Sequence, residues 1–416
     1  MNCPRRCLLL VFVLVSEIAF PLAGQEWTRF RGPNGAGESD AATNPVTWNT
    51  KDYNWRVRLP GTGHSSPVVW GERIFVTSGI DEDATRVIRC LNTSDGGLVW
   101  KQSFPSGKHA QNSANCYASS TPVVDEDRVY MTWATPEAYT VVALDQHKGS
   151  QVWRRDLGPF AAEHGFGASP ILFDEMLIVP NDQNGTSFVI ALDRKTGEIR
   201  WKADRRAVRA AYSTPIIYQP AEGPPQLILT CTAHGVSSLD PRTGKPNWEL
   251  PVFEKRVVGS PMIAAGLIIA SCGEGGGGKR MVAVGPGDPA KGTAAKVAYD
   301  FKDALPYVPI PVAYGKLVFL WSDQGMVTCA DASTGKVYWR ERVGGKFFGS
   351  PVRVADRLYC MSREGEMVVL AAADKYKLLG RINLEEPTHS TPAIAGGVMY
   401  LRTVSHLMSI GGKKSG

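Results

Sequence analysis

The sequence predicts an all-β protein, an eight-bladed β-propeller of four-stranded antiparallel blades whose last blade is closed by an N-terminal strand. This prediction rests on two repeated motifs and on the similar spacing between them in each repeat. A Ser-Pro or Thr-Pro step recurs every 40 to 55 residues, and an Asp-Gly-Trp pattern follows in register with it. Repetition at this period is typical of propellers and other repeat architectures. Gly 43 and Pro 28 of 416 residues supply the many turns that such a fold needs.

Residues 1–24 resemble a cleavable secretory signal peptide. Arg5 and Arg6 form a positive start, and the apolar run that follows, residues 7–15, is too short to span a bilayer. A membrane anchor is the alternative reading. Gln25 stands where the lipid-bearing Cys of a bacterial lipoprotein would be. We therefore expect a periplasmic or secreted chain without a lipid anchor and without stable membrane insertion.

The rest of the chain divides into a lead segment at 25–45, a propeller at 46–411 and a tail at 412–416. Eight blades of about 45 residues need about 360 residues, which this span provides. No linker interrupts it, so a two-domain organisation is not favoured.

The first motif marks the innermost strand of each blade. Seven Ser/Thr-Pro steps precede short apolar runs such as 68–70, and Ile310-Pro311 fills the eighth place. Short apolar runs rich in β-branched residues and bounded by Gly and Asp are typical of strands in meanders. The eight prolines are Pro67, Pro122, Pro170, Pro215, Pro261, Pro311, Pro351 and Pro392.

The second motif is small-x-Asp-x-x-x-Gly-x-x-x-Trp. Its Asp accepts backbone N–H groups in a turn, and its Gly allows positive φ. We expect each Trp to pack one blade on the next and its indole N–H to bond backbone. Two further copies are degraded, one with an insertion before Tyr299 and one with Ile382 in the Trp place. The five good copies end at Trp100, Trp153, Trp201, Trp248 and Trp339.

The final repeat stops before its Trp strand, and residues 54–59 supply the missing piece. Trp55 lies one repeat length before Trp100. We therefore predict that this N-terminal strand completes the last blade, which hides sheet edges that would invite aggregation.

Several familiar chemistries are not supported by the sequence. Six cysteines follow the signal peptide at irregular spacings without C-x-x-C, so we expect mostly small buried strand residues and leave any disulfide pairing open. Residues 273–279 imitate a phosphate-binding loop, but Arg280 stands where Ser or Thr is required, which favours a hairpin loop. A net charge of +6 is too weak to indicate nucleic acid as a partner.

The residues three positions before each proline are expected to line the central funnel. His64 and His389 belong to the first and last blades, which closure makes neighbours, so they could bind a metal or handle a proton. The simpler interpretation is that the two histidines occupy equivalent positions of the repeat and only form hydrogen bonds at the funnel mouth. The eight positions are His64, Ser119, Gly167, Tyr212, Val258, Val308, Phe348 and His389.

The loops above these positions carry charge and aromatic side chains. His164, Arg209, Lys255, Arg256 and Lys346 could form a basic rim for an anionic ligand, although Glu163 and Glu386 share it. Aromatics in the loops could stack on a planar ligand, with core packing as the alternative: Tyr117, Phe166, Tyr307, Phe347 and Phe348. We assign no catalytic residue and no metal ligand. The funnel or cofactor-binding candidates are His64, Tyr117, His164, Arg209, Tyr212, Arg256, Lys346 and His389.

The docking pattern resembles the tryptophan repeats of PQQ (pyrroloquinoline quinone) propellers over essentially the whole mature chain. This superfamily includes quinoprotein dehydrogenases and BamB-type outer-membrane assembly lipoproteins. The segment WTRFRGPNG at 27–35 is also similar to the lead of secreted PQQ-like propeller proteins. The dehydrogenases are longer and usually hold the quinone with adjacent cysteines and a calcium ion bound by acidic and amide groups. This chain has no adjacent cysteines.

The resemblance leaves three hypotheses. The first is a non-catalytic, monomeric binding or scaffold propeller with protein or peptide partners in the bacterial envelope or secreted space. The second is an alcohol or sugar oxidoreductase that uses PQQ and calcium. The third is a hydrolase or lyase that uses the two histidines and a metal.

Overall fold

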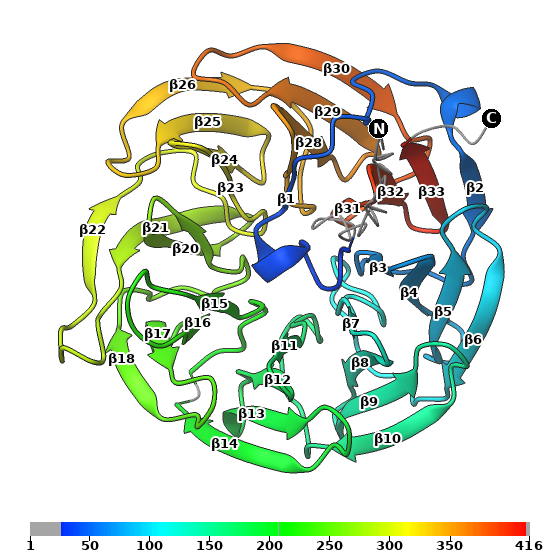
Figure 1. The fold of residues 1–416 in the computed structure, drawn as a ribbon, viewed down its shortest axis with the longest axis horizontal. Coiled ribbons are helices and arrows are strands. Elements are labelled where there is room, and N and C mark those ends of the chain that lie inside the picture. The colour runs from blue at the N-terminus through cyan, green and yellow to red at the C-terminus, as the bar shows by residue number, and fades with distance from the viewer. Residues whose placement is uncertain (1–25, 207, 413–416) are drawn as a thin grey trace, which may run out of the picture.

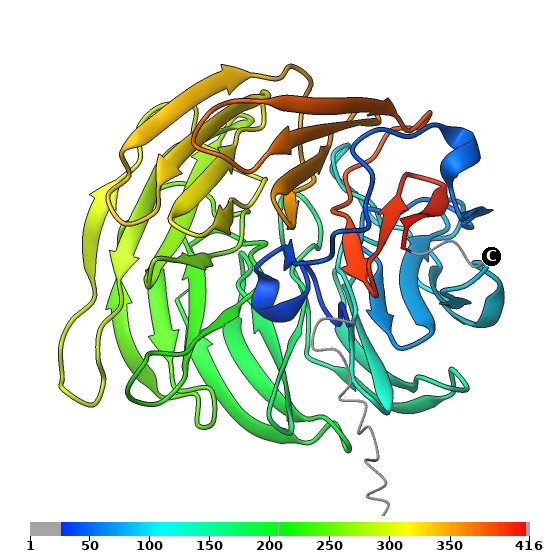
Figure 2. The ribbon, with the colours of Figure 1, turned by 45° about the horizontal axis from the view of Figure 1, so that its top comes forward.

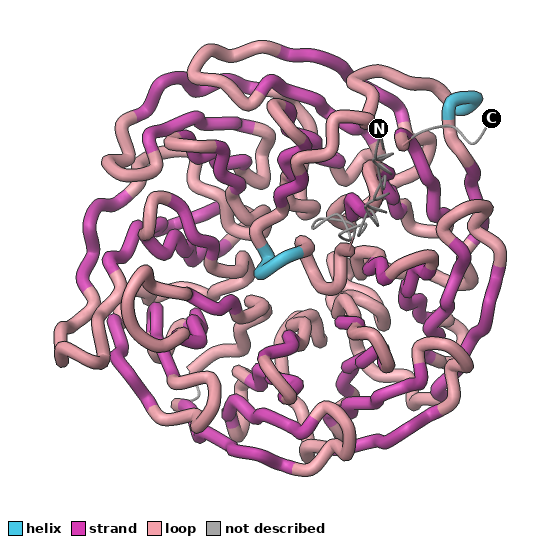
Figure 3. The backbone as a smooth tube through the Cα atoms, in the orientation of Figure 1, coloured by secondary structure: helices cyan, strands magenta, loops and turns pink. Residues whose placement is uncertain are grey.

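The computed structural model describes residues 26–206 and 208–412, so the predicted signal peptide lies outside the described residues. Eight sheets surround a central axis (Figure 1), and two short 3-10 helices, η1 (Pro33–Gly35) and η2 (Thr50–Asp52), are the only helices in the described part of the chain (Figure 3). The predicted eight-bladed propeller is confirmed. No helix in the described ranges is long and apolar enough to cross a membrane.

Each blade is an antiparallel meander that runs outward from the axis. Blade 1 has β3 (Val68–Trp70), β4 (Arg73–Gly79), β5 (Arg86–Asn92) and β6 (Leu98–Phe104). Blade 2 has β7 (Val123–Val124), β8 (Arg128–Ala134), β9 (Tyr139–Asp145) and β10 (Gln151–Asp156). Blade 3 has β11 (Ile171–Phe173), β12 (Met176–Asn181), β13 (Ser187–Asp193) and β14 (Ile199–Arg205). Blade 4 has β15 (Ile216–Tyr218), β16 (Gln226–Cys231), β17 (Gly235–Leu239) and β18 (Pro246–Leu250).

The second half of the ring repeats this plan. Blade 5 has β19 (Met262–Ala264), β20 (Leu267–Glu274), β21 (Gly277–Gly285) and β22 (Lys296–Asp300). Blade 6 has β23 (Val312–Tyr314), β24 (Leu317–Trp321), β25 (Met326–Asp331) and β26 (Val337–Arg342). Blade 7 has β27 (Val352–Val354), β28 (Arg357–Met361), β29 (Glu366–Ala371) and β30 (Leu378–Asn383). Blade 8 has β31 (Ala393–Ala395), β32 (Val398–Arg402), β33 (His406–Gly411) and, outermost, β2 (Trp55–Arg58).

The N-terminal strand closes the ring as predicted, because β2 pairs antiparallel with β33 and sets Trp55 opposite Ser409. One blade differs from the expected four strands. The lead segment contributes β1 (Glu38–Ser39), which pairs in parallel with β27 and makes blade 7 five-stranded.

The predicted tryptophan docking is present between successive blades. Trp100 donates to the Gln146 carbonyl at 2.9 Å, and its ring fills the space where Gly149, at φ +71°, has no side chain. Trp55, Trp153 and Trp201 dock in the same way. Tyr299 replaces Trp in blade 5 and donates to the Ala332 carbonyl at 2.6 Å. The ring therefore buries one aromatic side chain at most blade junctions.

Trp248 departs from this pattern. Its indole N–H donates to the Gln226 side chain of its own blade at 2.7 Å, not to the backbone of the next blade. The insertion in blade 5 that the sequence shows lies at this junction, because Gly287 packs against the Trp248 ring.

The small first residue of the motif faces the aromatic ring across the strand pair. Cys90 pairs with Trp100 and Cys329 with Trp339. Five of the six cysteines beyond residue 25 are buried in strands, as predicted, and only Cys116 lies partly exposed in a loop. All six, which lie within the described residues, are free thiols.

The Ser/Thr-Pro step has a structural reason that the sequence did not reveal. The hydroxyl before the proline accepts the backbone N–H of the matching residue one blade back, for example Ser66 N–H to Thr121 at 3.0 Å. Six such bonds link neighbouring inner strands, and the last, from Thr391 to Ser66, joins blade 8 to blade 1. The hydroxyls thus join neighbouring blades by hydrogen bonds between their inner strands. The proline that follows each hydroxyl has no backbone N–H, and the short inner strand does not need that donor.

Candidate functional site

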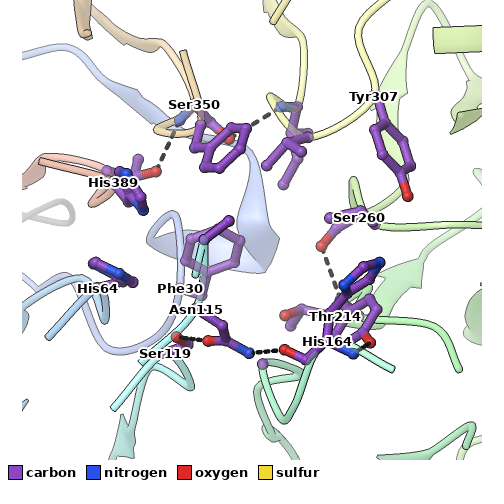
Figure 4. Close-up of a pocket in the computed structure, with 18 of the residues that line it drawn as sticks. Phe30, His64, Asn115, Ser119, His164, Thr214, Ser260, Tyr307, Ser350 and His389 are labelled. Carbon is purple, nitrogen blue, oxygen red and sulfur yellow. Dashed lines mark hydrogen bonds between the residues drawn. The ribbon is translucent and has the colours of Figure 1, made fainter. Parts of the chain in front are cut away.

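A cavity of about 420 Å³ occupies the centre of the ring. All eight positions counted from the repeats line it, among them Tyr212 and Phe348. Figure 4 labels three of the eight, His64, Ser119 and His389. The eight positions lie in the loops that enter the innermost strands. Five of the six hydroxyls that link neighbouring inner strands also line the cavity: Ser66, Thr121, Ser260, Ser350 and Thr391. The phase of the repeats is therefore sufficient to locate the cavity wall.

The lead segment closes one end of this cavity. Figure 2 shows it crossing the centre of the ring, and Phe30 lines the cavity from that side. Trp27 exchanges two backbone hydrogen bonds with Val69 of blade 1. The side-chain amide of Asn34 donates to the Ile217 carbonyl of blade 4 and accepts from the Ile217 backbone N–H. We therefore describe residues 26–40 as the plug of the funnel.

Arg31 is the centre of the plug. It is fully buried and its guanidinium donates five hydrogen bonds, all to backbone carbonyls. Two acceptors, Ile310 and Pro311, belong to blade 6, and Pro351 belongs to blade 7. Arg29 reaches the Pro215 carbonyl of blade 4 at 2.6 Å. Backbone acceptors thus hold the plug against three blades.

The other end of the funnel opens to solvent, and we call it the mouth. Gly275 and Gly276, in the β20–β21 hairpin, are exposed and also line the cavity. This hairpin is the segment that imitates a phosphate loop, and the expected hairpin is confirmed.

The mouth carries charge that is largely paired. Arg256 pairs with Glu163 and contacts His164, and its side chain is 7% exposed. Glu274 binds Lys255 at 2.7 Å and Arg209 at 3.5 Å. Because each of these cations has an acidic partner, the mouth is a mixed-charge surface and not a uniformly basic rim.

His64 and His389 lie side by side in the wall, with ring centroids 4.2 Å apart. Burial lowers the pKa of His64 to about 3, aided by His389 and Arg402. Burial and Arg363 lower the pKa of His389 to about 4. The Arg363 Nε–H donates to His389 Nε2 at 3.2 Å, which places the His389 proton on Nδ1. Both rings are therefore neutral near pH 7.

His164 and Tyr212 also line the cavity and are hydrogen-bonded to each other. The His164 backbone N–H donates to the Tyr212 hydroxyl at 3.2 Å, and Asn112 contacts the His164 ring at 2.8 Å. Burial and Arg256 lower the pKa of His164. Burial raises the pKa of Tyr212 to about 12. These side chains offer neutral hydrogen-bond donors and acceptors to a bound group.

The structure brings five of the eight candidates to the cavity and leaves three away from it. His64, His164, Tyr212, Arg256 and His389 line the cavity. Tyr117 points elsewhere, donating to the His109 carbonyl at 2.9 Å and covering Arg86. Arg209 and Lys346 do not line the cavity.

Sequence reasoning missed two parts of the site. The first is Phe30 of the plug, whose only local signal is an aromatic and basic run before the first repeat. The second is Asn112 and Asn115 of the β6–β7 loop; Asn115 bonds the His164 and Phe166 carbonyls. Of the loop aromatics, Phe348 and Tyr307 face the cavity, whereas Phe166 and Phe347 are buried in core clusters.

The cavity does not fit PQQ held with calcium. Calcium needs six to eight oxygen ligands with carboxylates among them. No Asp or Glu lines this cavity, and the described residues contain no group of three or more His, Cys, Asp or Glu placed to hold a metal. The two stacked imidazoles have no carboxylate beside them in the wall, so they do not form a metal centre of usual composition.

The docking repeats and the capped funnel define a PQQ-like eight-bladed propeller. More particularly, the chain belongs to the family described as outer membrane protein assembly factor BamB, which matches residues 84–296 and 295–403.

Solved structures share this fold at low sequence identity. BamB from Moraxella catarrhalis is 14% identical, with a TM-score of 0.62, and the match covers 87% of this chain and 97% of that one. Quinohemoprotein alcohol dehydrogenase from Comamonas testosteroni is 13% identical, with a TM-score of 0.67, over 93% of this chain and 80% of that one. The fold is therefore common to a BamB protein and to a quinohemoprotein alcohol dehydrogenase.

One curated relative is the tetrathionate hydrolase of Acidithiobacillus ferrooxidans. It is 24% identical over 222 residues, which is 51% of this chain and 42% of that protein. The chain thus spans less than half of the length of this relative.

Proposed function

We propose that this chain is a non-catalytic binding propeller of the bacterial envelope or secreted space that holds a protein or peptide partner at the mouth of its funnel. The observation that carries the proposal is the chemistry of the cavity wall. It is a dead-end pocket of aromatic, aliphatic, amide and hydroxyl side chains with three histidines, His64, His164 and His389, and Arg256, but with no carboxylate. Such a wall can receive a side chain, and because burial lowers the pKa of all three histidines, none of them is tuned upwards towards the pKa near 7 of an efficient general base.

The rest of the molecule supports this choice. The mouth presents paired charges around an apolar cavity, which is the pattern of a polar rim around an anchor pocket in protein interfaces. The family description names outer membrane protein assembly, which is consistent with an envelope partner.

Site-specific photo-crosslinking in cells tests the proposal. A photoreactive residue is placed at Lys346, exposed in the β26–β27 loop at the mouth. The matched control is Lys336, exposed in the β25–β26 turn on the opposite face. We expect one dominant protein adduct from position 346 that position 336 does not give. Adducts from position 336 alone would refute binding at the mouth.

A second experiment separates this proposal from a quinoprotein oxidoreductase. The purified chain is titrated with PQQ and calcium while its tryptophan fluorescence is followed, and dye reduction is assayed with alcohols and sugars. We expect no saturable quenching and no turnover, because the wall lacks calcium ligands. Saturable quenching together with dye reduction would replace the binding proposal by a dehydrogenase.

A further inference from the structure

The hydroxyls that line the funnel each carry a proton that the protein does not use. The oxygen of each accepts a backbone N–H of the preceding blade, as the Ser66 hydroxyl does from Thr391 at 3.3 Å. No acceptor for the hydroxyl's own proton lies within hydrogen-bond distance in the described part of the chain. A hydroxyl has one donor, so each of these side chains can still donate to a group inside the cavity. Five side chains share this arrangement: Ser66, Thr121, Ser260, Ser350 and Thr391.

The wall beside His64 and His389 lies close to buried positive charge. Arg402 of β32 is fully buried and donates only to oxygens of blade 1, with no carboxylate partner among the described residues. Arg363, which donates to His389, forms no ion pair in the described ranges either. Burial is the main cause of the lowered pKa of His64, and His389, Arg402 and Arg363 lower it further. Arg86 of β5, 1% exposed, is another buried guanidinium without an ion pair in the part of the chain described.

The described carboxylates do not offset this charge inside the cavity, because none of them lines it. Burial is the largest cause of the lowered pKa of His389, and Arg363 lowers it further by more than Glu364 raises it. Asp323 lies across the cavity from the two histidines, behind Tyr307 (Figure 4), and its oxygens accept the backbone N–H groups of Tyr307 and Val308 at 2.7 and 3.1 Å. The histidine side of the funnel is therefore the more favourable side for a negative charge.

These properties discriminate between the side chains that a partner could insert. An apolar side chain would displace water and leave the hydroxyl protons without acceptors, which costs free energy. A Lys or Arg side chain offers only donors and would add positive charge. A carboxylate accepts several hydrogen bonds and supplies the charge that is missing from the wall.

We propose that the histidine side of the funnel is a carboxylate site, in which the Ser66 and Thr391 hydroxyls donate to the acidic group of a ligand. This inference rests on the proposed function, because the ligand expected is an acidic side chain that a protein partner inserts through the mouth. A cavity of about 420 Å³ has room for such a side chain. A free organic acid would present the same group, so the experiment must separate the two sources.

Ligand-observed NMR on the purified full chain tests the site with short peptides. The probes are acetyl-Gly-Glu-Gly-amide, its Gln and Lys counterparts, and glutarate as a free organic acid. We expect the Glu peptide to bind at least about tenfold more tightly than the Gln peptide, and the Lys peptide to bind most weakly. Equal affinities for the Glu and Gln peptides, or no binding at concentrations on the order of 10 mM, would overturn the proposal. Tighter binding of glutarate than of the Glu peptide would overturn the partner side chain as the source of the carboxylate.

Ser66→Ala removes one of the two proposed donors, and Ser169→Ala is its matched control. The Ser169 hydroxyl accepts the Thr121 N–H at 3.0 Å, as Ser66 accepts that of Thr391, but Ser169 does not line the cavity. Both variants lose one hydrogen bond between blades, so both should lower the Tm by about 2–5 °C. Only Ser66→Ala should weaken binding of the Glu peptide, roughly fivefold. Equal peptide affinities in the two variants would overturn the assignment of the site.

The photo-crosslinking experiment separates failure of this inference from failure of the proposed function. A protein adduct from position 346, together with peptides that bind without preference for a carboxylate, would overturn the carboxylate site and leave binding at the mouth in place. The absence of both the adduct and the preference would overturn both.

Discussion

The two ends of the funnel are held by different kinds of interaction. At the plug, Arg31 donates only to backbone carbonyls, and β1 pairs with β27. At the mouth, charged side chains pair with one another, as Arg209 does with Glu163 at 3.4 Å. Carbonyl positions are fixed by the sheets, whereas exposed ion pairs are weak and replaceable. The comparison teaches that the closed end is part of the fold and the open end is an adjustable surface.

The largest expected effect comes from removing the tie at the closed end. Arg31→Met deletes five hydrogen bonds and leaves buried carbonyls of blades 6 and 7 unpaired. We expect a loss of about 3–5 kcal/mol in the free energy of unfolding, measured with urea. A loss below about 1 kcal/mol would mean that the plug is only a loosely attached arm.

A smaller effect is expected from the floor of the cavity. Phe30→Ala removes a partly buried ring that lines the cavity, and should cost about 1–3 kcal/mol. Phe30→Leu should retain most of the stability. The same urea experiment checks both, and a crystal structure should show a deeper cavity in the alanine variant. Unchanged depth would show that another side chain forms the floor.

Lowering the pH should reduce the stability of the folded chain by protonating the histidine pair in the wall, and it should not change the charge of the plug arginines. The pKa of His64 and His389 is about 3 and 4 when folded, and about 6.5 when unfolded, so the unfolded chain binds more protons between these values. Stability is therefore lost as pH falls from about 6.5 towards 4. Asp323 opposes this, since burial raises its pKa to about 6 and its contribution is lost as pH rises.

The double variant His64→Gln, His389→Gln isolates the imidazoles. We expect it to lose less stability than wild type over this window, by on the order of 1–3 kcal/mol, in urea unfolding at a series of pH values. Parallel pH profiles for the two proteins would show that neither imidazole is kept neutral by folding.

The smallest effect is expected at the mouth. Arg209 is 30% exposed and its partners Glu163 and Glu274 are nearly half exposed, so Arg209→Ala should change stability by about 0.5 kcal/mol or less. The difference should vanish in 1 M salt, where the Debye length is about 3 Å. A loss of stability above about 1 kcal/mol that persists in high salt would show that the ion pairs of Arg209 stabilise the fold, as the plug does.

The sequence anticipated whatever depends on local spacing. Asp145 and Gly149 set a turn that delivers Trp153 one strand later, and this geometry does not depend on the other blades. The funnel positions follow because each is a fixed distance from the proline that opens a blade. Arg86 and Arg402 escaped notice, since an arginine in a strand looks like a solvent-facing residue until its neighbours are known.

The plug and the chemistry of the mouth also escaped prediction. Arg31 binds carbonyls more than 270 residues away, and every residue has a carbonyl, so no side-chain pattern marks its acceptors. Tyr117, Arg209 and Lys346 do not line the cavity although their loops lead to it, because contacts with neighbouring blades decide which side chains of a loop turn inwards. Glu274 neutralises Lys255 and Arg209 from the β20–β21 hairpin, whose sequence gave no sign of that role.

The sequence by itself determined the number of blades, the strand that closes the ring and the wall positions, because these follow from repeat length and short-range turn chemistry. Only the tertiary structure decided which end of the funnel is closed, which charges are paired and where unpaired cations are buried. Those properties arise from contacts between distant segments, where burial and geometry, and not residue type, set the energy of a charge.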